Sequence, residues 1–160
     1  MGEHDFRLHN QSNAPSYEED WAAWLTSQVE LLKSRRFEEI DYDNLIDEVE
    51  SLVRSNFRGF VSAVEVVMTH MLKWGFQLAY QSKSWARSIA LHRLRVTIEL
   101  EKCPSYCSHI YEAIAKAYRG ARFVAERETG LLRQTFPAEC RYTWDEIMTR
   151  SLRFTPSDSE

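Results

Sequence analysis

Apolar residues recur along most of this chain at intervals of three and four, the spacing of an amphipathic α-helix. The first such pattern follows Ser16. Ser16 and Glu19 have the spacing of a capping box, so we predict a helix from Ser16 to about Ser34. Its apolar stripe, interrupted by one glutamine, comprises Trp21, Trp24, Leu25, Gln28 and Leu32.

The longest helical pattern runs from residue 41 to residue 79. Asp41 or Asp43 is suited to cap it. Around Ser55–Gly59 the pattern weakens, and because glycine destabilises a helix interior we predict a kink or short break there. The segment then forms two helices, and the second ends near Ala79. The buried faces are expected to comprise Leu45, Val49, Leu52 and Val53 in the first helix, and Phe60, Val61, Val64, Met68, Met71 and Leu72 in the second.

A further helix is predicted to begin at Ser82 or Ser84, either of which suits an N-terminal cap, and to end before Pro104. This helix is apolar on two sides, which indicates a central position in the fold. One side comprises Trp85, Ile89, Val96 and Leu100, and the other comprises Leu91, Leu94 and Ile98.

Two more helices follow. Ser105 is expected to cap the first, and Gly130 is expected to end it, because glycine readily takes the left-handed conformation of a C-terminal cap. Thr143 and Glu146 have the spacing of a second capping box, which predicts a short final helix from Trp144. The small residues that allow a neighbouring helix to approach closely are Ala117, Gly120 and Ala121.

The predicted elements are all helices, because no segment shows the alternation of a strand. The sequence therefore predicts an all-α fold, an irregular up-and-down bundle of five to six helices. The length favours one domain, which we assign to residues 17–154. Residues 1–16 are expected to form a disordered N-terminal arm and residues 155–160 a loose C-terminal tail.

Charge is distributed unevenly along the chain. Residues 1–50 hold 13 acids and 4 bases, whereas residues 51–133 hold 6 acids and 13 bases. One interpretation is that acidic and basic helices attract each other within the fold. The other is a basic face for nucleic acid. The arginines are scattered over several helix faces and the total charge is −4, so we do not expect nucleic acid binding.

The composition also bears on the compartment. The longest apolar runs are too short to span a membrane, and the polar N-terminus lacks the apolar stretch of a signal peptide. Three cysteines cannot all pair within one chain, which fits a reducing compartment. We therefore expect a cytoplasmic protein.

Several short motifs together resemble those of a bacterial family known as domain of unknown function 29. They are YEEDWAAWL, DNLIDEVESL, THMLKWGFQ and SKSWARSI in the first part of the chain, and PSY, AYRGAR, ETGL and TFPAEC downstream. The resemblance covers about residues 17–150. It implies a small, soluble, all-helical bacterial protein, and it implies no particular activity.

One polar cluster stands out as a candidate site. His70, Lys73 and Gln77 share one helix face by their spacing, and a histidine near a lysine tends toward its neutral form. If the preceding helix folds back on this one, the cluster either binds an anion or performs acid–base chemistry, or it is a buried network that fixes how two helices align. The second interpretation is the one we favour. The candidate residues are Asn44, Glu48, His70, Lys73 and Trp74.

The residue types of a zinc site are present, but their spacing is poor. Cys103, Cys107, His109 and Cys140 lack the paired C-x2-C spacing of structural zinc sites. The Glu-x-x-His pairs of helical di-iron sites are also absent from the sequence. We therefore predict no metal and no cofactor.

The absence of a strong catalytic motif favours a non-enzymatic interaction or regulatory module. Its partner is expected to be another protein or a second copy, because Trp21 and Trp24 lie near acidic residues and could be buried in a dimer. The alternative is a hydrolytic enzyme. It is either an acid–base catalyst centred on His70 or a ribonuclease similar to the HEPN class, whose short Arg-x4-His motif matches Arg87 and His92.

Overall fold

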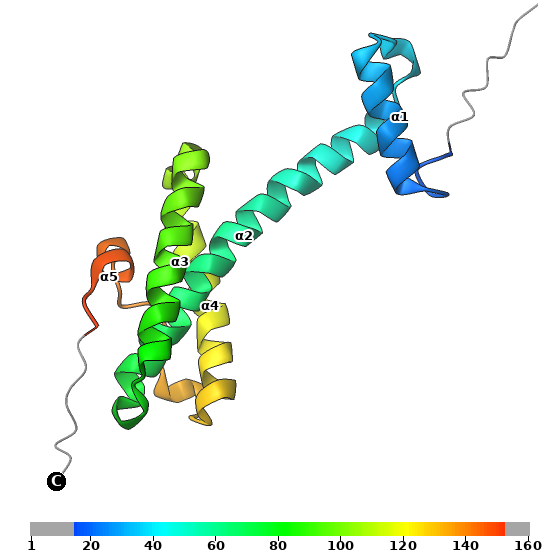
Figure 1. Ribbon diagram of the computed structural model, residues 1–160. Coiled ribbons are helices and arrows are strands. Elements are labelled where there is room, and N and C mark those ends of the chain that lie inside the picture. Colours follow the sequence, from blue (N-terminus) through cyan, green and yellow to red (C-terminus); the bar gives the residue numbers. More distant parts are fainter. Residues whose placement is uncertain (1–14, 153–160) are drawn as a thin grey trace, which may run out of the picture. The chain divides into compact units, whose positions relative to one another are not determined.

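The computed structural model describes residues 15–152, and these form helices and turns with no strand (Figure 1). The prediction of an all-α fold is confirmed. The predicted arm at residues 1–16 falls almost wholly outside the described residues, and the predicted tail at residues 155–160 falls wholly outside them. The contacts divide the chain into two compact units, residues 1–53 and residues 54–160, and the assignment of one domain stays a prediction. Over residues 15–152, none of the helices combines the length and the apolar character that a membrane span requires.

The first unit contains α1 (Trp21–Lys33), a short 3-10 turn, and the beginning of α2 (Tyr42–Phe76). Asp20 caps α1, because its carboxylate accepts the N–H of Ala23. The prediction that Ser16 caps this helix is therefore wrong. Ser16 does pair with the Glu19 side chain, but the two residues close a separate turn before the helix.

Few apolar side chains hold the first unit together. Among residues 15–53, Trp24 and Ile40 are the buried apolar residues, and Gln28 is buried with them. The side-chain oxygen of Gln28 accepts the backbone N–H of Asp41 at 2.9 Å, and the indole N–H of Trp24 donates to the Asp41 carboxylate at 3.2 Å. Hydrogen bonds around Asp41 therefore fix α1 against the start of α2.

The predicted break at residues 55–59 is wrong, because α2 is one helix of 35 residues. A glycine in a helix interior costs only about 1 kcal/mol relative to alanine, and the packing of Phe57 and Phe60 beside Gly59 offsets a penalty of that size. The buried face predicted for residues 45–53 is also largely wrong. Val49, Leu52 and Val53 are each more than half exposed.

The second unit contains the rest of α2, then α3 (Lys83–Lys102), α4 (Ile110–Thr129) and α5 (Trp144–Thr149), with 3-10 turns at Leu78–Tyr80, Pro104–His109 and Arg133–Thr135. Three predicted caps are confirmed. Ser82 caps α3, Gly130 ends α4 with φ +71°, and Thr143 forms a complete capping box with Glu146.

The start of α4 differs from the prediction. Ser105 lies within the 3-10 turn rather than at a helix cap, and α4 begins at Ile110 without a side-chain cap. Pro104 opens the turn because its ring fixes φ near the helical value.

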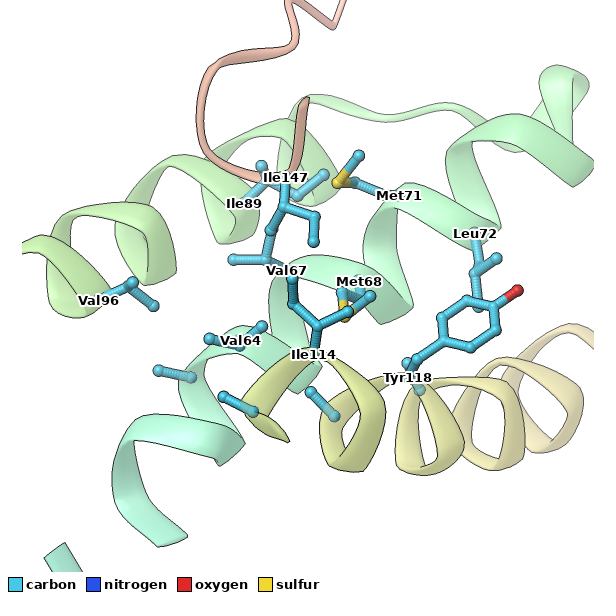
Figure 2. Packing of buried hydrophobic residues seen from close by; sticks show 14 of the residues in the cluster. Val64, Val67, Met68, Met71, Leu72, Ile89, Val96, Ile114, Tyr118 and Ile147 are labelled. Carbon is cyan, nitrogen blue, oxygen red and sulfur yellow. The ribbon is translucent and has the colours of Figure 1, made fainter. Parts of the chain in front are cut away.

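The core of the second unit forms where α2, α3, α4 and α5 meet (Figure 2). The labelled side chains there are Val64, Val67, Met68, Met71 and Leu72 of α2, Ile89 and Val96 of α3, Ile114 and Tyr118 of α4, and Ile147 of α5. Close approach at the small residues of α4 is confirmed, because a methyl group added at Gly120 would overlap the carboxylate of Glu65 on α2. The central position predicted for α3 is wrong, since its second apolar side faces solvent.

Candidate functional site

Lys73 of the predicted cluster is buried, and its ammonium group contacts side chains of two other helices. Its Nζ atom lies 2.7 Å from Oε2 of Glu128 on α4. The same atom lies 4.4 Å from the centre of the Trp85 ring on α3, within the range of a cation–π interaction. One ammonium group therefore joins α2, α3 and α4.

His70 lies one turn before Lys73 and is held by its own helix. Its Nδ1 atom lies 3.0 Å from the backbone oxygen of Val66. Because a carbonyl only accepts, Nδ1 carries the proton in the neutral ring and Nε2 is left as an acceptor. Burial lowers the pKa of His70, and the nearby Lys73 lowers it further, while the Val66 carbonyl acts in the opposite direction. Burial therefore favours the neutral form of the imidazole.

The remaining polar side chains near this face hold neighbouring segments in place. The Gln77 amide donates to the backbone oxygen of Thr129 at 3.1 Å, which ties the end of α2 to the end of α4. The Gln81 amide donates to the backbone oxygen of Trp74 at 3.0 Å. Trp74 itself is buried. The polar side chains of the cluster in the second unit therefore form a packed network, and each named contact is made to another residue of the same chain.

Asn44 and Glu48 take their contacts in the first unit. The Asn44 amide donates to the Asp41 carboxylate at 2.7 Å, and Glu48 accepts the hydroxyl of Tyr17 at 2.7 Å. The prediction placed them beside His70 through a tight connection between two helices. That connection does not exist, because α2 runs unbroken through this region.

A cavity of about 380 Å³ adjoins the C-terminal end of α2. Tyr142 and Arg150 line it, and they also line a second cavity of about 350 Å³. The Arg150 guanidinium stands 5.7 Å from the centre of the Tyr142 ring, and burial raises the pKa of that phenol. His70 and Lys73 line neither cavity. Of the predicted cluster, Trp74 lines the first cavity, and the two titratable side chains of its second-unit part do not face either space.

The residues considered for a ribonuclease site and for a zinc site do not form a common site in the described part of the chain. Arg87 is exposed, and the Nδ1 atom of His92 lies 2.9 Å from the Ser88 carbonyl of its own helix. Cys103, Cys107 and Cys140 are free thiols. Over residues 15–152, no three histidine, cysteine or acidic side chains are placed to hold a metal ion together.

An exposed apolar surface on α2 is the feature that sequence reasoning missed. Tyr42, Ile46, Val49 and Val53 recur at helical spacing, and each is more than half exposed. We call these four residues the α2 stripe. The apolar pattern itself was visible in the sequence, where part of it was interpreted as a buried face. Periodicity identifies an apolar face, but it does not say whether the same chain covers that face.

Comparison with known proteins places the chain in a family. None of the curated proteins and none of the solved structures matches this chain. The model of the family described as domain of unknown function DUF29 matches residues 16–152, a range that includes nearly all of the described residues. The chain therefore belongs to the DUF29 family.

Proposed function

We propose that this chain is a protein-interaction module and that the α2 stripe is its binding surface. The observation that carries the proposal is the imbalance of the first unit. Among residues 15–53, two apolar residues are buried, whereas nine large apolar side chains are exposed. The exposed ones are Trp21, Val29, Leu32, Phe37, Tyr42, Ile46, Val49, Leu52 and Val53.

The exposed apolar residues of the first unit favour binding to a partner, because burying them removes apolar surface from water. A unit of this size buries too little apolar area to be stable on its own, and isolated proteins rarely expose large contiguous apolar patches. Covering the α2 stripe would remove apolar surface from water at about 25 cal/mol per Å². Binding would therefore stabilise the first unit as well as join it to a partner.

Acidic residues accompany the stripe. Asp43 and Asp47 are exposed on the same turns of α2. Charges at the rim of an interface affect the choice of partner and the rate of association more than the affinity. The partner is therefore expected to present an apolar helix face with basic residues beside it.

The contacts of the polar cluster support a structural role over catalysis. Lys73 is engaged by Glu128 and Trp85, and His70 is held by Val66. An acid–base catalyst needs a group that faces a space for substrate, and the cavities near α2 are lined by other residues. We further propose a cytoplasmic location, which the three free thiols support because they suit a reducing compartment.

Site-specific photo-crosslinking in cells tests the proposal. A photoreactive phenylalanine analogue at Val49 should form a covalent adduct with a partner, and adding Ile46→Glu in the same chain should remove the adduct. The same analogue at Ser55, exposed on the opposite side of α2, is the control and should give little adduct. Equal yields at positions 49 and 55, or no adduct at position 49, would overturn the proposal.

A further inference from the structure

A second exposed apolar stripe lies on α3, in the second unit. Leu91, Leu94 and Ile98 are 60%, 57% and 38% exposed. Ile89 and Val96 are fully buried and lie on the opposite side of the helix, as expected at about 100° per residue. We call Leu91, Leu94 and Ile98 the α3 stripe. It is apolar surface that the core of its own unit does not use.

The two stripes match in spacing. Ile46, Val49 and Val53 on α2 are separated by three and four residues, and the α3 stripe repeats the same intervals. Helices pack by fitting the side-chain ridges of one into the grooves of the other, and stripes with the same repeat suit this arrangement. The two surfaces therefore match in side-chain spacing as well as in apolar character.

Their surroundings carry opposite charge. Residues 15–53 contain 11 acids and 3 bases, and residues 54–152 contain 9 acids and 15 bases. Three bases and one acid are exposed near the α3 stripe, namely Arg87, Arg95, Lys102 and Glu101. Three acids and one base are exposed near the α2 stripe, namely Asp43, Asp47, Glu50 and Arg54. Pairing two α2 stripes would bring acids against acids, and pairing two α3 stripes would bring bases against bases. Charge complementarity therefore favours an α2 stripe against an α3 stripe.

We infer that the partner of this module is a second copy of the same chain, in which the α2 stripe of each copy packs on the α3 stripe of the other. This inference rests on the proposed function and names the partner for that surface. Each copy carries one stripe of each kind, so a twofold dimer can form two equivalent contacts that leave neither stripe exposed. The arrangement uses the acidic first unit and the basic second unit of each chain as complementary surfaces.

Complementation between two variants of the full chain is the sharpest test. Val49→Gln/Val53→Gln disables the α2 stripe, and Leu91→Gln/Leu94→Gln disables the α3 stripe. All four positions are more than half exposed, so circular dichroism and thermal melting should show that both variants fold. Sedimentation velocity should find the wild type dimeric and each variant monomeric. In an equimolar mixture one intact contact remains, so a dimer of intermediate affinity should reappear.

Two controls sharpen the result. Leu132→Gln removes a comparably exposed apolar side chain outside both stripes and should leave the dimer unchanged. Reversing charge at Asp43→Lys/Asp47→Lys should weaken the dimer at low salt, and mixing that variant with Arg87→Glu/Arg95→Glu should restore part of it. Loss of this rescue at about 1 M salt would support a charge-based contact, because the screening length is then only about 3 Å.

The outcomes separate the inference from the proposed function. A monomeric wild type at all concentrations overturns the inference, and an adduct at Val49 with a different protein would then leave the proposed function standing. A dimer that survives Leu91→Gln/Leu94→Gln, or two variants that fail to complement, also overturns the inference. A monomer that gives no adduct at Val49 overturns both.

Discussion

Lys73 of α2 and Glu128 of α4 form a salt bridge of 2.7 Å whose two ends differ in exposure. The Lys73 side chain is 9% exposed and the Glu128 side chain is 41% exposed. A buried ammonium without a partner is costly, whereas a carboxylate with access to water can be hydrated instead. The bridge should therefore respond differently to the loss of each partner.

We expect Glu128→Gln to destabilise the second unit more than Lys73→Met does. The first change leaves a buried charge with a weaker partner and should cost about 2 kcal/mol, whereas methionine keeps the packing on Trp85 and should cost less than about 1 kcal/mol. Urea denaturation of the two variants and the wild type measures the difference. Equal losses, or a larger loss for Lys73→Met, would contradict this account.

The placement of His70 one turn before Lys73 was predictable because it depends only on helical spacing, whereas Gln77 lies beyond the end of α2 at Phe76. The partners of these side chains were not predictable. Glu128 and Thr129 come from α4, more than fifty residues later in the chain, and local patterns carry no information on pairs so far apart. The expected partners Asn44 and Glu48 were chosen for their nearness in sequence, an argument that failed when α2 proved continuous.

His70 should make the stability of the second unit depend on pH below neutrality. Burial holds its pKa below the ordinary value of 6.5 in the folded protein, so the unfolded chain takes up a proton more readily. Stability from the neutral ring is then present above about pH 6.5 and is lost as the pH falls through the folded pKa. His70→Gln should flatten the decline in unfolding free energy between pH 7 and pH 5.

The pKa of His70 can be measured directly by NMR titration of its ring protons. A pKa at or above 6.5 in the folded protein would contradict the prediction.

Arg93 of α3 should be required for the placement of α5. Its Nε, Nη1 and Nη2 atoms donate to the backbone oxygens of Ile147, Arg150 and Glu146, so one guanidinium satisfies three carbonyls at the end of a short helix. A lysine keeps the charge but lacks the planar fork. Arg93→Lys should cost about 2 kcal/mol, with the loss concentrated in α5.

Amide hydrogen exchange measures that localisation. Residues 144–150 should exchange faster in Arg93→Lys than in the wild type, while the core of α2 keeps its protection. Arg95→Lys changes an exposed arginine on the same helix and should leave exchange in α5 unaltered.

The α2 and α3 stripes show which part of the fold could not be predicted from the sequence, namely which apolar helix faces are buried. The helical periods of α2 and α3 were identified, and so were the caps at Ser82, Gly130 and Thr143, because caps depend on residues adjacent in sequence. Which apolar face is buried depends on how many neighbours a helix has. Residues 49–53 of α2 and the second side of α3 were expected to be covered, and in this chain they face solvent.

Glu65 of α2 offers the last prediction, because its carboxylate lies against Gly120 of α4. A methyl group at Gly120 would overlap that carboxylate, and burial raises the pKa of Glu65 above 4.5. An acid with a raised pKa in the folded state stabilises the protein while it is protonated, and this contribution is lost as the pH rises through the folded pKa.

Glu65→Gln mimics the protonated group in size and should be more stable than the wild type at pH 7, with the advantage shrinking toward pH 4. The exposed Glu101→Gln removes the same charge and should not show this pattern. Urea denaturation at both pH values decides the matter, since a Glu65→Gln variant less stable than the wild type at pH 7 would mean that the ionised carboxylate has a stabilising partner.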